Sequence, residues 1–150
     1  MKDLDSKEEC DKRANQEDPI VMYFIVNEDL GMSTGKCCAQ VAHSCQKMTM
    51  EYCKIMEDQC YFDKHFNDPE WVRVFTQWLE TSFRKVVLRA HQKEFDKIKQ
   101  ELIDIVVVKD NGLTEIAPGS ETVIGLYPIF RSQCPKIIKR LQVLKSITHD

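Results

Sequence analysis

The sequence predicts an α/β fold with three layers, in which helices cover both faces of a four-stranded sheet of mixed direction. Short apolar runs rich in β-branched residues alternate with longer segments whose apolar residues recur at helical spacing. The first run, residues 20–26, is apolar on both faces, as expected for a strand that is covered on both sides. A chain of 150 residues is long enough to form one domain with its own core.

The first half of the chain is expected to form one strand and two helices. After the strand at residues 20–26, a glycine-containing turn follows, and Ser33 or Thr34 can cap a helix that runs to about residue 58. A loop is expected at residues 59–67. Asp68 and the proline after it then begin a second helix, which has a tryptophan-containing apolar stripe.

The second half is expected to add three strands and two helices. Strands are predicted at residues 86–88, 105–108 and 122–127, with an amphipathic helix between the first two. A last helix opens at Ser132 and has Leu144 among its inward-facing residues. The order of elements is therefore β-α-α-β-α-β-β-α, which indicates a mixed sheet with helices on both faces.

Composition indicates a cytoplasmic protein without a membrane segment. No stretch approaches the roughly 18 consecutive apolar residues of a membrane span, and no apolar signal sequence follows the first residue. The odd number of cysteines, seven, favours reduced thiols. Residues 1–18 carry seven acids and four bases and are interpreted as an acidic, disordered tail before the domain at 19–150.

The net charge of −3 is unfavourable for binding a nucleic acid. The distribution of the charges along the chain, however, leaves room for a local basic surface. Residues 1–18 contribute 4 − 7 = −3, so the remainder is formally neutral. Residues 131–149 contain five bases and no acid. This stretch is interpreted either as a basic face for nucleic acid or as an ordinary solvated surface.

The predicted first helix carries a polar stripe. Lys36, Gln40 and His43 lie within about 60° of one another around the helix axis, while a broad cysteine-rich arc is expected to face the sheet. The stripe should therefore face solvent or a cleft. Lys36 lies in the first turn, where its ammonium and free backbone N–H groups would attract a phosphate or an oxyanion. The alternative is an exposed lysine without a function.

Two other motifs in this region do not support their usual functions. Residues 31–37 resemble a phosphate-binding loop, but the glycine spacing is one residue short and Cys37 replaces the hydroxyl residue that binds magnesium. Three cysteines near His43 suggest zinc, yet His43 points away from them on the helix and no second ligand pair follows. The cysteines at 38, 45, 53 and 60 are expected to pack in the core, and no metal is predicted.

A second candidate site follows the third predicted strand. Loops at the carboxyl ends of strands form the ligand crevice of open α/β sheets. Asp110 and Gly112 are typical turn residues, which is a sufficient structural explanation for them. The functional interpretation makes Asp110 a general base or an orienting carboxylate, with Thr114 and Thr122 as hydroxyl donors. Both interpretations remain open.

Three blocks of sequence together resemble the signature of the type-two peptidyl-tRNA hydrolases, the archaeal and eukaryotic class. The middle block matches the family's second strand, and the likeness covers about residues 20–128 apart from the centre. The blocks are Asp29-Leu30-x-Met32-x-x-Gly35-Lys36-x-x-Ala39-Gln40-Val41-Ala42-His43, then Lys85-Val86-Val87-Leu88, and then Asp110-x-Gly112-Leu113-Thr114-x-Ile116-x-Pro118-Gly119-x-x-Thr122-Val123.

The resemblance implies hydrolysis of the ester that links a peptide to the 3′ end of tRNA, without a metal or organic cofactor. Peptidyl-tRNA would be the partner, and a homodimer is implied by likeness alone. Asp110 and His43 would position and activate water, while Lys36 would hold the oxyanion or the terminal ribose-phosphate. The implied catalytic residues are Lys36, His43, Asp110, Thr114 and Thr122, and the implied substrate-binding residues are Gly35, Gln40 and Gly112.

The sequence departs from the family pattern at several positions. Asn27 stands where arginine is usual, Glu115 replaces glutamine, and Gly125 alters the last strand. The helical segment at residues 46–77 is also longer than usual. Two alternative functions therefore remain: a non-catalytic member that binds RNA or a protein, and an esterase that acts on another acyl-tRNA.

Overall fold

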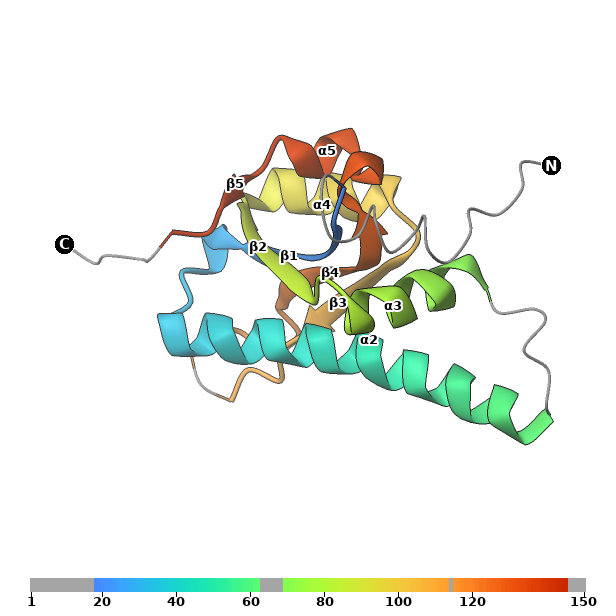
Figure 1. Cartoon of the computed structure of the whole chain (residues 1–150). Helices are drawn as coiled ribbons and strands as arrows, with labels where there is room; N and C mark the ends of the chain where they lie inside the picture. Colours follow the sequence, from blue (N-terminus) through green and yellow to red (C-terminus); the bar gives the residue numbers. More distant parts are fainter. Residues whose placement is uncertain (1–17, 63–68, 114, 146–150) are drawn as a thin grey trace.

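The centre of the molecule is a five-stranded sheet with the order β3-β4-β1-β2-β5. The computed structural model describes residues 18–62, 69–113 and 115–145, with the backbone alone for 59–62 (Figure 1). The predicted α/β class is confirmed, whereas the predicted number of four strands is wrong. The strands are β1 (Ile20–Asn27), β2 (Arg84–Ala90), β3 (Ile105–Lys109), β4 (Glu121–Phe130) and β5 (Gln142–Val143).

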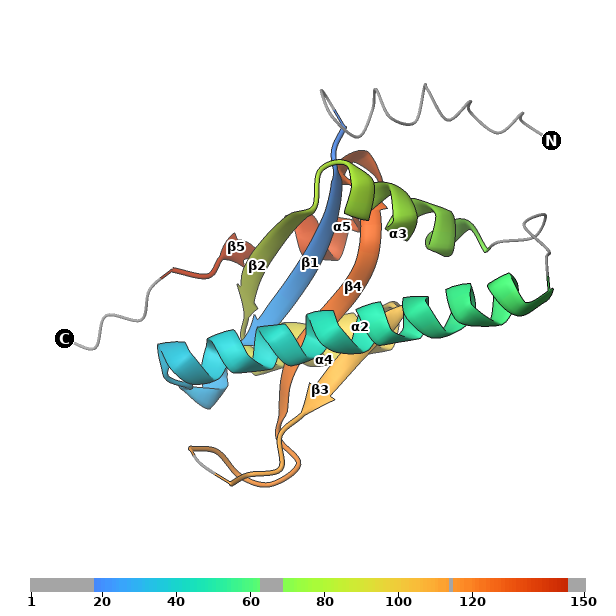
Figure 2. The same cartoon turned by 60° about the horizontal axis from the view of Figure 1, so that its bottom comes forward.

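Helices lie on both faces of this sheet, as Figures 1 and 2 show, and they form the predicted three layers. One face is covered by α2 (Thr34–Phe62) and α3 (Glu70–Glu80), and the other by α4 (Gln92–Glu101) and α5 (Lys136–Lys139). Short 3-10 turns, η1 (Glu28–Leu30) and η2 (Arg131–Gln133), follow β1 and β4.

The central strand β1 is buried along its whole length, as its apolar sequence predicts. Its side chains alternate between two cores, with Met22 and Phe24 on the α2 and α3 side and Val21 and Ile25 on the other. It runs parallel to β2 and antiparallel to β4, so the predicted mixed direction is confirmed.

The end of the described chain differs from the prediction. The last helix was expected to include Leu144, but α5 spans only four residues and the chain then extends into β5. Val143 pairs with Leu88 of β2, and the Leu144 N–H donates to the Val87 carbonyl at 3.0 Å. The pairing satisfies backbone groups along an edge of β2 that would otherwise lack partners, which a helix could not do.

Other boundaries differ by a few residues. β4 was expected to end at residue 127 but continues through Pro128 to Phe130, where its ladder with β1 resumes after a register shift. The loop expected at 59–67 is helical to Phe62, and its remainder lies outside the described residues, as do Asp68 and residues 1–17 of the predicted tail. No described helix combines the length and the apolar character needed to cross a membrane.

The helix α2 faces the sheet with much of the predicted cysteine-rich arc, since Cys37, Val41, Cys45 and Met48 lie in the core or pack against it. Gln40 and Ser44 are buried, whereas Cys38 and Cys53 are exposed, so the prediction that these two cysteines pack in the core is wrong.

Of the polar stripe, Lys36 and Gln40 contact Asp110 beside the sheet, whereas His43 remains exposed. The physical reason for the close approach of α2 lies on β4, where Gly125 offers no side chain.

The fit at Gly125 is tight. A Cβ atom there would lie 2.2 Å from Ser44 Oγ and 2.7 Å from Met48 Cε. Non-bonded atoms do not approach this closely, so any larger residue at position 125 must displace the helix or its side chains. Gly125 therefore sets the separation between α2 and the sheet, and with it the depth of the polar stripe.

We expect Gly125→Ala to lower the free energy of unfolding by about 1–3 kcal/mol, because the added methyl overpacks the contact. Ser44→Ala alone should change it little, since the buried Ser44 Oγ has no hydrogen-bond partner among the described residues. Combined with Gly125→Ala it should recover part of the loss. Urea unfolding of the four proteins measures this coupling, and strictly additive effects would contradict the proposed contact.

Candidate active site

The start of α2 and the loop after β3 meet through an ion pair. The Lys36 Nζ atom lies 2.6 Å from Asp110 Oδ1. The Lys36 and Asp110 side chains are only 12% and 9% exposed. The two candidate sites of the sequence are thus one site. A charged pair that is largely withdrawn from water needs further hydrogen bonds to be stable, and the surrounding residues supply them.

The loop fixes Asp110 through its own backbone. The Gly112 N–H donates to Asp110 Oδ2 at 2.7 Å, while the Asp110 N–H and carbonyl bond to Ser120 and Gly119 across the base of the loop. Gly112 has φ 70°, and a Cβ there would lie 2.4 Å from the Pro118 nitrogen, so only glycine fits. Asp110 is therefore both a turn residue and the candidate catalytic carboxylate.

Gln40 and Thr122 form a chain of hydrogen bonds that leads to the Asp110 carboxylate. Gln40 Nε2 donates to Asp110 Oδ1 at 3.2 Å, and the Thr122 hydroxyl donates to Gln40 Oε1 at 2.6 Å. Thr122 Oγ1 also lies 3.3 Å from the Val108 carbonyl. Thr122 is fully buried and Gln40 is 3% exposed, so both residues orient Asp110 rather than present a surface to a substrate.

These contacts keep Asp110 ionised. The hydrogen bond from Lys36 is the main cause that lowers the pKa of the Asp110 carboxyl below its ordinary value, and the Gly112 N–H, the Lys36 charge and the Gln40 amide add to it. Desolvation acts in the opposite direction and is outweighed. At neutral pH the site thus contains a carboxylate that is a weak base and an ammonium that it holds in place.

A second contact ties the loop to the beginning of α2. Ser33 caps the helix, since its Oγ accepts a hydrogen bond from the Lys36 N–H at 3.3 Å. The Glu115 carboxylate accepts hydrogen bonds from the Ser33 N–H, at 2.9 Å, and from the Ser33 hydroxyl. The hydroxyl bond is the largest cause of a lowered Glu115 pKa, followed by the N–H bond and the Lys36 charge. Glu115 is therefore a structural link.

The remaining predicted residues are not part of this network. His43 is exposed and has no hydrogen bond or ion pair with the described residues, and Gly35 is exposed with open space around it. Thr114 lies outside the described residues. Asn27 is 2% exposed and donates to Gln92 Oε1 at 2.8 Å, so it is an internal residue. Among the described side chains, no three His, Cys, Asp or Glu residues are placed to hold a metal ion.

The structure belongs to the α/β class, and its largely buried ammonium–carboxylate pair lies where a strand ends, as ligand sites of open α/β sheets do. Within this class, the family profile described as Peptidyl-tRNA hydrolase PTH2 matches residues 20–144. The chain belongs to this family, and the resemblance found in the three sequence blocks is confirmed.

Curated relatives agree with this assignment. The chain is 31% identical over 128 residues to a protein named peptidyl-tRNA hydrolase from Thermoplasma acidophilum. The aligned region covers 82% of this chain and 97% of the relative. Proteins of the same name from Aeropyrum pernix and Sulfolobus acidocaldarius are 33% and 28% identical over 111 and 112 residues. These matches cover 70% and 71% of this chain and 80% and 85% of the relatives.

The lowered pKa of Asp110 predicts how its contribution to stability depends on pH. A carboxyl whose pKa is depressed by folding stabilises the protein above its unfolded value, about 3.9, and this stabilisation is lost as pH falls through the folded value. We expect the difference in unfolding free energy between wild type and Asp110→Asn to be constant near neutrality and to shrink below about pH 4.

Urea unfolding at a series of pH values measures this difference. Asp58→Asn is the matched control, because Asp58 is an exposed acid in α2. A difference for Asp110→Asn that stays the same down to about pH 2 would show that the ion pair does not form in solution.

Proposed function

We propose that the protein hydrolyses the ester bond between a peptide and the 3′ end of tRNA. The observation that carries this proposal is the Lys36–Asp110 pair, held in one geometry by Gln40, Thr122 and Gly112 in a chain of this family. The names of the curated relatives support the same substrate. No cofactor is needed for this reaction, and translation makes the cytoplasm the expected compartment.

In the proposed reaction, water attacks the carbonyl carbon of the ester and the bond from that carbon to the 3′ oxygen breaks. The peptide leaves with a carboxylate, and the 3′ oxygen of tRNA takes up a proton. Negative charge develops on the carbonyl oxygen in the transition state. The Lys36 ammonium in the first turn of α2 is positioned to donate a hydrogen bond to it, and such stabilisation is usually the largest catalytic effect.

Asp110 acts mainly by holding Lys36 and orienting water. Its two oxygens already accept three hydrogen bonds, from Lys36, Gln40 and Gly112. An ionised carboxylate has about four acceptor sites, which leaves room for one water molecule. Because its pKa is lowered, Asp110 is a weaker base than a free aspartate, and precise placement of water matters more than proton affinity.

The substrate is expected to extend from this pair along the exposed side of α2. His43 lies seven residues after Lys36, about 10 Å along the helix, so its exposed ring is proposed to contact tRNA or a water at the edge of the site. Gly35 leaves the helix start open to an anionic group. Thr114 is proposed from the family likeness only.

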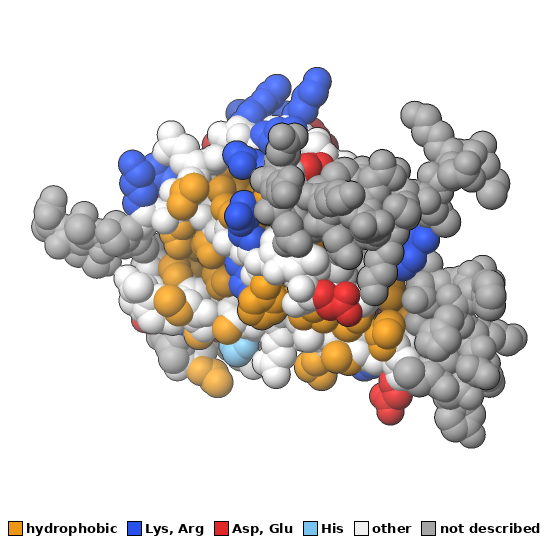
Figure 3. Space-filling view, in the orientation of Figure 1, with side chains coloured by type: hydrophobic (Ala, Val, Ile, Leu, Met, Phe, Trp, Pro, Cys, Tyr) orange, Lys and Arg blue, Asp and Glu red, His pale blue; other side chains and the backbone are white. Residues whose placement is uncertain are grey.

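A basic surface elsewhere on the molecule is a candidate contact for the tRNA backbone. In Figure 3, lysine and arginine side chains gather at the top, where Figure 1 places α5. Arg131, Lys136, Lys139 and Arg140 are exposed bases in or close to α5. We propose that they contact phosphates, and a homodimer remains a proposal from family likeness.

The first test follows release of deacylated tRNA from N-acyl-aminoacyl-tRNA. We expect wild type to turn over, and Lys36→Ala and Asp110→Ala each to lose activity by about 10²-fold or more. The double variant should lose little more than either alone, because the two residues act as one unit. Lys93→Ala, which removes an exposed lysine of α4, is the control and should remain active.

Equal rates in wild type and both site variants would eliminate the proposed site. A wild-type protein that binds the substrate without hydrolysing it would instead support the non-catalytic alternative. Circular dichroism of each variant establishes that a loss of activity does not reflect a loss of folding.

Thr122 provides a test of positioning. Thr122→Val keeps the shape of the side chain but removes the hydrogen bond to Gln40, which frees the amide that orients Asp110. We expect kcat to fall by about 10- to 100-fold with little change in KM, because the buried hydroxyl does not face the substrate. Thr122→Ser restores the hydroxyl and should recover most of the activity. A change confined to KM would show direct substrate binding instead.

A further inference from the structure

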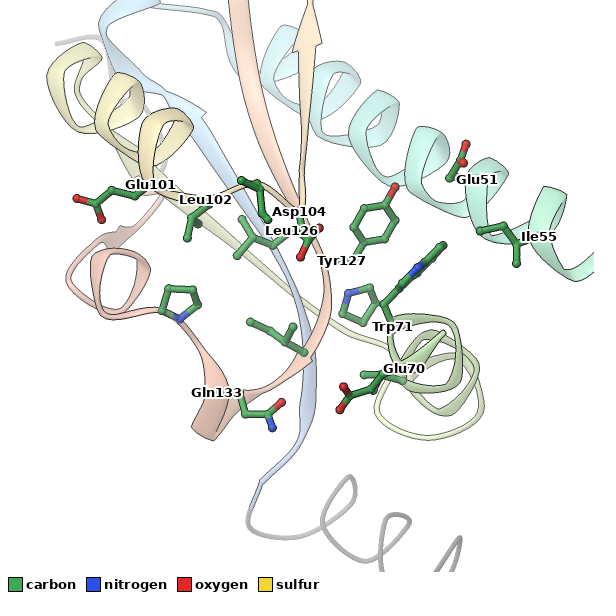
Figure 4. A pocket seen from close by; sticks show the side chains of 15 residues that line it. Glu51, Ile55, Glu70, Trp71, Glu101, Leu102, Asp104, Leu126, Tyr127 and Gln133 are labelled. Atoms are coloured by element: carbon green, nitrogen blue, oxygen red, sulfur yellow. The ribbon is translucent and has the colours of Figure 1, made fainter. Parts of the chain in front are cut away.

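A groove lies at the opposite end of the molecule from the active site. It has a volume of about 800 Å³ and is formed by the later part of α2, the start of α3, the end of α4 and the end of β4 (Figure 4). The segment at residues 46–77, which the sequence singled out as unusually long, supplies five of its fifteen lining residues. The proposed reaction does not use these residues.

The charged residues that the structure describes along the groove have one sign. Among the described residues, Glu51, Glu70, Glu101 and Asp104 line it without any Lys, Arg or His, although Glu101 also pairs with Lys97 at 3.7 Å. All four carboxylates belong to exposed side chains. A concave surface with charges of a single sign attracts a partner of the opposite sign and repels an RNA backbone.

Two aromatic side chains stand between these acids. The rings of Trp71 and Tyr127 are 4.7 Å apart at 53°, and both residues are half-buried. In Figure 4 they lie next to each other, with Glu51 on one side and Asp104 on the other. Aromatic faces with carboxylates beside them favour an arginine or lysine side chain, which gains from both the ring and the charge.

The apolar surface beside the aromatic pair is also unusual. Ile103 is 91% exposed at the groove, whereas Leu126, which also lines it, is 4% exposed and belongs to the core. Exposed aliphatic and aromatic groups within a polar rim are the pattern of a protein interface rather than of a site for an ion alone. The expected partner is therefore a polypeptide with both basic and apolar side chains.

The strand edge in the groove limits how such a partner can bind. β3 pairs with β4 only as far as Leu126, while β4 continues to Phe130. Pro128 lies in the stretch that β3 leaves unpaired and lacks an N–H group, which is a common device against strand addition. Contacts by side chains are therefore favoured over extension of the sheet.

We propose that this groove is a docking site for a basic, amphipathic segment of a protein partner. An arginine or lysine of the partner packs against Trp71 and Tyr127 between Glu51 and Asp104, and its apolar neighbours cover Ile103. The site is independent of the hydrolytic reaction. Asp104 and Asp110 are separated by the length of β3, about 20 Å, so the partner and the ester occupy different ends of the sheet.

The test uses a synthetic amphipathic helix of leucine and arginine residues, with a glutamate-for-arginine version as control. Titration into the 15N-labelled full chain is followed by NMR. We expect the arginine peptide to shift the Trp71 indole resonance in a saturable way, and the glutamate peptide to leave it unchanged. The variant Glu51→Lys with Asp104→Lys should weaken binding by about tenfold or more.

The matched control is Glu80→Lys with Glu94→Lys, which changes the net charge equally through two exposed acids that do not line the groove. It should weaken binding by less than about twofold, and both double variants should hydrolyse peptidyl-tRNA like wild type. Failure of the arginine peptide to shift Trp71 up to about 1 mM would overturn the proposal. Shifts there caused by tRNA, or by protein concentration alone, would also overturn it and identify RNA or a second copy as the occupant.

Discussion

An ammonium and a carboxylate held 2.6 Å apart with little access to water are the constraint on which this structure depends. Such a pair gains stability only where its remaining hydrogen-bonding groups are satisfied. The Gly112 N–H and the Gln40 amide donate hydrogen bonds to Asp110, and the Thr122 hydroxyl in turn donates to Gln40. These three groups come from different parts of the chain. α2 must therefore lie close to the sheet with a polar side turned inward.

The sequence predicted much of the fold because its main signals are local. The fully apolar run of β1 and the helical spacing of α3 and α4 identify these elements without tertiary information. β5 was missed because two residues form a strand only where β2 offers unpaired groups 55 residues earlier, as in the pair Leu88 and Val143. The burial of Ser44 on α2 was missed because it depends on Gly125, which lies on a distant strand.

In the candidate site, too, residues with local sequence signals were found, whereas some contacts between distant residues were not. Lys36 and Gln40 share a helical stripe, and Asp110 follows a strand, so local patterns found all three residues. The fold brings them together, because Lys36 and Gln40 both donate hydrogen bonds to Asp110. The link between Ser33 and Glu115 spans 82 residues and has no local signature. Glu115, which replaces the family's usual glutamine, joins the loop to the start of the helix that carries Lys36.

The loop after β3 also shows where an engineer has freedom. Position 112 accepts no side chain, since its backbone is left-handed and Pro118 fills the space where a Cβ would be. The next residue, Leu113, is 86% exposed and does not contribute to the core. Saturation libraries aimed at altered acyl preference should therefore vary position 113 and leave its glycine neighbour untouched.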